Sequence, residues 1–150
     1  MSRRTSEASK AIREAWVTEQ QLVLEGKGTR DWTPEQQQSI IDKGKSYDDE
    51  GKAFEGHHMK SAEAYPEYQG HSKNIQFLSR IEHQEAYGGS YRNHTNGYYD
   101  SETHLTIDFG ENIYIPCEVI ALSNPVTCLS FNEIIEEKPL EQKLERKTNY

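Results

Sequence analysis

Five of the six histidines of this chain lie between residues 51 and 97. His57 and His58 are adjacent, Asn74 follows sixteen residues after the second histidine, and His83 follows nine residues after Asn74. Imidazole transfers protons and binds divalent metal ions near neutral pH, because its unperturbed pKa is about 6.5. Hydrolysis of a phosphodiester bond needs a base that deprotonates water and a cation that neutralises charge on the phosphate. The spacing of these four residues is suited to that chemistry.

The charge of the chain argues against one class of nucleic-acid protein. The formal net charge is -8, whereas a protein that coats nucleic acid neutralises phosphates with an excess of Lys and Arg. Residues 51–97 nevertheless contain five Lys or Arg and five Asp or Glu, so this segment is neutral before any cation binds. The histidine-rich segment is therefore where chemistry is expected.

The first part of the chain predicts two helices. Residues 4–25 combine apolar and charged side chains without proline, which is typical of an amphipathic helix. After a loop, Thr33 is the expected N-cap of a second helix, with Pro34 in the first turn and Gln36 completing a capping box. Gly44 is expected to end this helix.

The histidines are expected to lie on two strands and a helix. Residues 54–59 and 74–78 predict the strands, and residues 80–87 predict a short helix that Gly88 and Gly89 stop. We therefore predict an α+β fold, in which N-terminal helices precede a core of two strands and a helix and a small antiparallel extension.

A glycine-broken segment with a further strand follows this helix. Asn96 and Gly97 predict a hairpin-type turn, and residues 105–109 alternate in the manner of a strand. The acidic and basic tail from residue 133 to residue 150 predicts a solvated helix or a disordered end.

We divide the chain into one helical segment (1–45), one catalytic core (46–110) and a C-terminal extension (111–150) that is partly disordered or helical. Cys117 and Cys128 form no metal-binding pair and no disulfide framework.

The sequence from residue 47 to residue 100 resembles a known superfamily. Gly56-His57-His58, then Asn74, then His83 on a terminal helix resemble the HNH (His-Me finger, ββα-metal) endonucleases. The similarity is to the bacterial polymorphic-toxin branch with a GHH signature, and more distantly to colicin-type nuclease domains. It implies a nuclease in which one short segment supplies the base and the metal ligands.

The resemblance assigns a role to each residue of the constellation. It implies that His58 is the general base, that His57 and His83 bind the metal ion, and that Asn74 bonds backbone across the hairpin loop to support the base. Side chains alternate along a strand, so His57 and His58 can serve one site only if the backbone bends near Gly56.

Tyr87 departs from the pattern, because colicin-type relatives carry a histidine four residues after the equivalent of His83. Three accounts remain open: water or a substrate oxygen fills the position, Tyr87 is a weak ligand, or the chain is an attenuated variant. Mg²⁺ and Mn²⁺ tolerate water-rich coordination, so we expect one divalent ion of that kind, with Zn²⁺ or Ni²⁺ as alternatives.

Three cations near the constellation are candidates for substrate binding. Lys60, Arg80 and Arg92 could hold phosphates on either side of the cut. Such contacts position a duplex without reading its bases, so we expect low sequence specificity.

The leading interpretation is a metal-dependent DNase that acts as an antibacterial toxin or effector and is matched by an immunity protein. The resemblance favours DNA over RNA. One alternative is a phage or mobile-element HNH nicking nuclease, and another is a catalytically weakened binding module that a metal ion stabilises. The N-terminus lacks a Sec signal and no apolar run is long enough to span a membrane, so synthesis in the cytoplasm, followed by secretion or delivery into a target cell, is expected.

Overall fold

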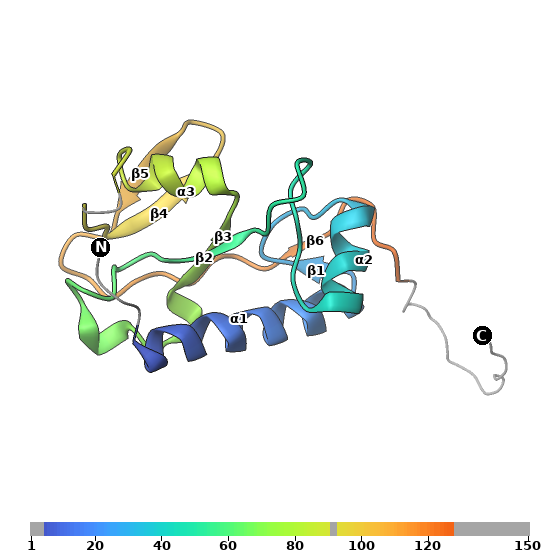
Figure 1. The fold of residues 1–150 in the computed structure, drawn as a ribbon, viewed down its shortest axis with the longest axis horizontal. Coiled ribbons are helices and arrows are strands. Elements are labelled where there is room, and N and C mark those ends of the chain that lie inside the picture. Colours follow the sequence, from blue (N-terminus) through green and yellow to red (C-terminus); the bar gives the residue numbers. More distant parts are fainter. Residues whose placement is uncertain (1–4, 91–92, 128–150) are drawn as a thin grey trace, which may run out of the picture.

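The computed structural model describes residues 5–90 and 93–127, and it confirms the predicted α+β class. Arg92 and the predicted helical or disordered tail lie outside the described residues. The elements follow one another along the chain, and Figure 1 shows their arrangement. In chain order they are α1 (Ser6–Leu24), β1 (Lys27–Gly28), α2 (Pro34–Lys43), β2 (Glu55–His58), η1 (Pro66–Tyr68), η2 (Ser72–Asn74), β3 (Ile75–Leu78), α3 (Arg80–Ala86), β4 (Gly97–Asp100), β5 (Leu105–Asp108) and β6 (Ile120–Ala121).

Local capping residues determine where the helices begin and end. The Thr5 hydroxyl accepts a hydrogen bond from the backbone N–H of Ala8 and caps α1. The predicted capping box of α2 is confirmed, since the side chains of Thr33 and Gln36 each accept from the other residue's backbone N–H. Gly44 follows α2 with a φ of 85°, a left-handed conformation that glycine adopts without strain. Among the described helices, no helix is long and apolar enough to cross a membrane.

Three antiparallel pairs make up the strand structure of the described residues. β2 pairs with β3, β4 with β5, and β1 with β6. The third pair was not expected, because residues 27–28 were predicted as loop. It joins the C-terminal extension to the segment that follows α1.

Two sequence predictions are wrong in detail. Asn74 ends the 3-10 helix η2, so the second strand begins one residue later than predicted. Gly97 opens β4 instead of occupying a hairpin turn, because its N–H bonds to the carbonyl of Met59 and the residue pairs with Asp108. The turn between β4 and β5 falls later, at residues 101–104.

The N-terminal helices belong to the same core as the strands. The indole of Trp16 in α1 stacks on the ring of Phe77 in β3, with ring centroids 3.9 Å apart. Trp32 meets Phe54 edge to face at 5.1 Å, and Leu122 returns to the same cluster from the C-terminal side. Aromatic pairs in these geometries add to the stabilisation from buried apolar area. The helices are therefore structural partners of the histidine-bearing strand.

A buried carboxylate ties α1 to the loop after it. Glu19 is 1% exposed, and it accepts hydrogen bonds from the backbone and hydroxyl of Thr29 and from the indole N–H of Trp32. A buried ionised carboxylate is tolerated when several donors satisfy it. These three donors hold the 27–32 loop against α1.

α1 crosses directly over Gly56 of β2. A Cβ atom at Gly56 would lie 2.8 Å from Cγ2 and 2.9 Å from Cγ1 of Ile12. Such separations are shorter than carbon atoms in van der Waals contact allow. The glycine of the Gly-His-His sequence is thus required by packing against α1.

Replacement of Gly56 with alanine is expected to lower the free energy of unfolding by about 1–3 kcal/mol, the usual cost of overpacking a core. Urea denaturation would measure this loss. Ile12→Ala should relieve the clash, so the alanine at Gly56 should cost less in that background. Gly70→Ala is the matched control, because its Cβ would lie 3.8 Å from the nearest side-chain atom. An equal loss at both glycines would contradict the packing explanation.

Candidate active site

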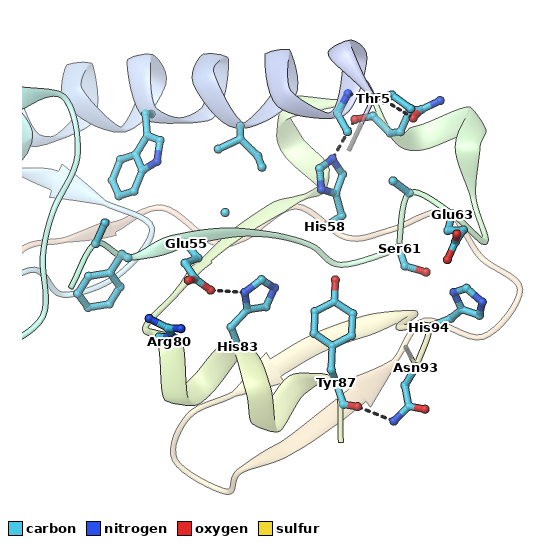
Figure 2. A pocket seen from close by; sticks show the side chains of 18 of the residues that line it. Thr5, Glu55, His58, Ser61, Glu63, Arg80, His83, Tyr87, Asn93 and His94 are labelled. Carbon is cyan, nitrogen blue, oxygen red and sulfur yellow. Dashed lines mark hydrogen bonds and ion pairs between the residues drawn. The ribbon is translucent and has the colours of Figure 1, made fainter. Parts of the chain in front are cut away.

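A cavity of about 880 Å³ lies between α1 and α3, with β2 between them. Figure 2 shows His58 on the α1 side of this cavity and His83 and Tyr87 on the α3 side. Glu55, Arg80, Ser61 and other polar side chains line the rest of it. The volume falls within the range of ordinary ligand sites. Residues far apart in the sequence thus face one shared space.

The α3 side of β2 brings two histidines and a tyrosine together. The rings of His57 and His83 have centroids 5.0 Å apart in an edge-to-face arrangement. The ring of Tyr87 lies 5.3 Å from that of His57 and 5.0 Å from that of His83. The two histidines to which the resemblance assigns metal binding, and the tyrosine that departs from the family pattern, are therefore neighbours in space.

Glu55 orients His83 from the same face of β2. Its Oε1 lies 2.6 Å from Nδ1 of His83, so the imidazole donates its Nδ1–H to the carboxylate and Nε2 is left as the nitrogen that can bind a metal ion. Sequence reasoning missed Glu55. The two-residue alternation of a strand could have found it, because Glu55 and His57 must share a face.

His58 lies on the opposite face of β2. The strand pairs with β3 in regular register, with His57 opposite Gln76 and His58 opposite Ile75, so no bend near Gly56 turns the two side chains toward one site. His83, which lies beside His57, is the histidine that lines the same cavity as His58. Nε2 of His58 is 3.0 Å from the carbonyl oxygen of Gln69, which lies in the loop after η1. The two adjacent histidines are thus directed to different neighbours, and His58 reaches the cavity beneath α1 (Figure 2).

Asn74 connects the two ends of the hairpin loop. Its Oδ1 accepts from the backbone N–H of Lys60 at 2.9 Å, and its Nδ2 donates to the carbonyl of Lys60 at 3.0 Å. The side-chain amide of Asn74 therefore bonds to the backbone of Lys60 as a paired strand would. This contact restrains the chain directly after His58.

The structure describes two of the three candidate phosphate contacts, and these two occupy different environments. Arg80 is exposed at the start of α3 and lines the cavity. Lys60 is only 2% exposed, and its ammonium donates to Oδ1 of Asn96 at 2.6 Å and lies 4.4 Å from the centroid of the Tyr65 ring. Its burial directs that charge into the protein instead of into the cavity. Arg92 is outside the described residues.

A salt bridge and a capping box hold α3 against the sheet. Ser79 and Glu82 form the capping box of α3. The carboxylate of Glu82 also accepts hydrogen bonds from Nη1 and Nη2 of Arg30, at 2.8 and 3.3 Å. Arg30 additionally donates to the carbonyl of Phe77 in β3. One arginine from the N-terminal loop thus joins the end of β3 to the first turn of the helix that carries His83.

The environment of His57 favours its neutral form. The side chain is 1% exposed, and within the described part of the chain its Nδ1 has no hydrogen-bond partner. Burial lowers the pKa of His57 well below its ordinary value, and the nearby His83 and His58 lower it further. A neutral, buried imidazole with an unsatisfied nitrogen is the form in which histidine binds metal ions.

Across residues 5–90 and 93–127, no three His, Cys, Asp or Glu side chains converge as a ready metal site. The two imidazoles of His57 and His83 would therefore need other oxygen or nitrogen atoms to complete a coordination shell.

Comparison with known proteins identifies a family that covers most of these elements. The family described as GHH signature containing HNH/Endo VII superfamily nuclease toxin matches residues 2–79. The match includes α1, β2 and β3, so the helix that packs on Gly56 belongs to the family's own pattern.

Animal proteins show a partial similarity. The chain is 34% identical to Teneurin-4 and 35% identical to Teneurin-3 of Mus musculus over 74 residues, and 34% identical to Teneurin-3 of Danio rerio over the same length. Each match covers 49% of this chain, and only 2% of the mouse proteins and 3% of the fish protein. The similarity is therefore confined to a small part of very long chains.

The buried neutral His57 predicts a pH-dependent stability. Below about pH 6.5 the unfolded chain protonates this residue while the folded chain does not, so folding loses stability as the pH falls. As the pH falls from about 7 toward 5, the parent should therefore lose stability that His57→Gln does not lose. Urea titrations of the parent and His57→Gln at both pH values would measure the contribution as a difference.

His71→Gln is the matched control, because His71 is exposed and does not line the cavity. It should keep the pH dependence of the parent. Parallel curves for the parent and His57→Gln would contradict the assignment of a buried, neutral His57.

Proposed function

Because this chain belongs to the family of GHH-signature HNH/Endo VII nuclease toxins, we propose that it is a metal-dependent endonuclease that hydrolyses DNA with low sequence specificity. The observation that carries the proposal is that His58 and His83 line one cavity from opposite sides of β2. A base and a metal-binding group on either side of a phosphate are what hydrolysis of the phosphodiester requires.

His58 is the proposed general base. When its Nε2–H is donated to the carbonyl of Gln69, the imidazole has a defined tautomer in which Nδ1 is the basic nitrogen. A positioned imidazole of this kind accepts a proton from water near neutral pH. Asn74 supports the base indirectly, because it restrains the backbone of Lys60 two residues later.

His57 and His83 are the proposed metal-binding residues. The unsatisfied Nδ1 of His57 and the Glu55-oriented ring of His83 fit a divalent cation, because the two imidazoles lie side by side on the same face of β2. When bound, such an ion neutralises charge on the phosphate and stabilises the departing oxygen. Glu55 acts through His83 as a positioning residue.

The ligand set bears on the identity of the ion. Two imidazoles are typical of Zn²⁺ and Ni²⁺, whereas a shell completed by water and phosphate oxygens is typical of Mg²⁺ and Mn²⁺. Tyr87 stands beside both histidines and is a poor ligand while its phenol is protonated. We propose Mg²⁺ or Mn²⁺, with Zn²⁺ or Ni²⁺ as the alternatives.

Arg80 is the proposed phosphate contact on the substrate side. It is exposed, carries a guanidinium group, and lies at the start of α3, where it lines the same cavity as His83. A guanidinium group bound to phosphate oxygens positions the duplex but carries no information about its bases, which supports the proposed low specificity. The buried Lys60 is proposed to stabilise the loop after His58 instead.

We propose an antibacterial toxin or effector as the biological setting, with an immunity protein in the producing cell. The family name carries the toxin part of this proposal. A second candidate is a metal-stabilised binding module with weakened catalysis. Two observations raise this second candidate. Tyr87 stands where colicin-type relatives carry a histidine, and the site offers two imidazoles, whereas a closed structural zinc site has four protein ligands.

Plasmid cleavage by the purified protein tests the proposal. With Mg²⁺, Mn²⁺, Ni²⁺ or Zn²⁺, supercoiled DNA is expected to be nicked, and a chelator should stop the reaction. His58→Ala should lower the rate by about a hundredfold or more, because a positioned base contributes about that factor. His71→Ala, which lies outside the cavity, should cleave like the parent.

Tyr87→His separates an attenuated nuclease from a binding module. Cleavage by Tyr87→His but not by the parent would show that the natural chain is a weakened nuclease. Absence of cleavage from the parent and from Tyr87→His with all four metals would overturn the nuclease proposal.

A further inference from the structure

The β4–β5 hairpin is attached to the rest of the protein through β4. The N–H of Gly97 bonds to the carbonyl of Met59 at 3.1 Å. The side-chain amide of Gln76 in β3 bonds to both the N–H and the carbonyl of Tyr99, at 3.0 and 2.8 Å. The hydroxyl of Tyr99 also donates to Glu85 of α3. The inner edge of the hairpin is therefore occupied.

The outer edge belongs to β5. In an antiparallel pair, successive residues direct their N–H and C=O groups alternately toward and away from the partner strand. The backbone groups of Gly97 and Tyr99 point away from β5, toward Met59 and Gln76. The N–H of Phe109, just after β5, donates to the carbonyl of Asn96 on the β4 side. The N–H and C=O groups of Thr106 and Asp108 consequently face away from β4. Within the described residues, no other strand pairs with this edge.

The side chains of β5 are as exposed as its backbone edge. All four of its residues are exposed, and the apolar Leu105 and Ile107 are 66% and 56% exposed. Tyr98, opposite Ile107 in the register, is 37% exposed. Exposed apolar edge strands are templates for pairing with another chain unless charge or burial protects them. Here the alternation Leu-Thr-Ile-Asp places apolar side chains on one face and Asp108 on the other.

The charge carried by the hairpin and the segment after it indicates which chain would pair there, although Arg30 of the N-terminal loop also acts on Tyr98. Residues 93–127 contain no Lys or Arg, and five carboxylates: Asp100, Glu102, Asp108, Glu111 and Glu118. Three of these lie within residues 97–108. A second copy of this chain would bring two such acidic hairpins together, and their like charges would repel one another. A strand with basic side chains would meet opposite charge instead.

We propose that the free edge of β5 binds a partner protein, which adds one strand whose side chains alternate between apolar and basic. The apolar side chains would lie beside Leu105 and Ile107, and the basic ones beside Asp108. Main-chain bonds to Thr106 and Asp108 would supply affinity, and the alternation would supply specificity. We expect this strand to belong to an immunity protein of the proposed nuclease. Only this identity of the partner rests on the proposed function.

A synthetic peptide tests the edge independently of any nuclease activity. The probe is a fluorescent peptide of alternating valine and lysine. The control peptide is identical except that glutamate replaces each lysine. The lysine peptide is expected to bind the parent about tenfold or more tightly than the glutamate peptide, and added salt should reduce the difference. Plasmid cleavage is measured on the same preparations. Peptide binding then tests the edge of β5, and cleavage tests the nuclease proposal, so either can fail without the other.

Two substitutions distinguish edge pairing from a general effect. Thr106→Pro removes an outward N–H, which edge strands tolerate, and it should weaken binding of the lysine peptide about tenfold or more. Asp108→Lys should reverse the preference toward the glutamate peptide, which a merely unfolded variant would not do. Equal binding of both peptides, no binding of either, or a dimer of the parent in sedimentation experiments would overturn the proposal.

Discussion

The close contact between Ile12 and the Cα of Gly56 is the constraint on which the arrangement of the site depends. Because α1 packs on one face of β2 without an intervening side chain, α3 must cover the other face, and successive residues of the strand serve different neighbours. Glu55 and His57 meet α3, whereas Gly56 and His58 meet α1. This alternation supports the proposed division between metal binding and proton transfer, because His58 and His83 line the one cavity between the two helices.

Side-chain amides take the place of a third strand around the small β2–β3 pair. Asn74 bonds to both backbone groups of Lys60, and Gln76 bonds to both backbone groups of Tyr99. A two-stranded hairpin alone is marginally stable in water. The two amides, together with the Arg30–Glu82 ion pair, fix the hairpin, the loop after His58 and the helix of His83 relative to one another. The proposed site is therefore held in place by Asn74 of the constellation together with Gln76, Arg30 and Glu82 outside it.

The local elements could be predicted from the sequence, because they rest on short-range signals: Thr33, Pro34 and Gln36 start a helix, and the order of strand, strand and helix follows from residue type. The long-range contacts could not. Nothing near Lys60 indicates that Asn96 and Tyr65 enclose its ammonium, and nothing near residues 27–28 indicates pairing with residues 120–121. Gly97 was taken for a turn residue because Asn-Gly favours turns, whereas the tertiary bond to Met59 places it in a strand. Glu55 was recoverable, since strand alternation alone places it beside His57.

Calorimetric titration of Mn²⁺ into the parent, His57→Gln and His58→Ala tests the division of labour most directly. The account predicts that His57→Gln weakens binding by about tenfold or more, because one of two imidazole ligands is lost, while His58→Ala binds within about twofold of the parent. Equal weakening in both variants, or no measurable binding by the parent, would contradict the assignment of the metal ion to the α3 side of β2 and of the base to the α1 side.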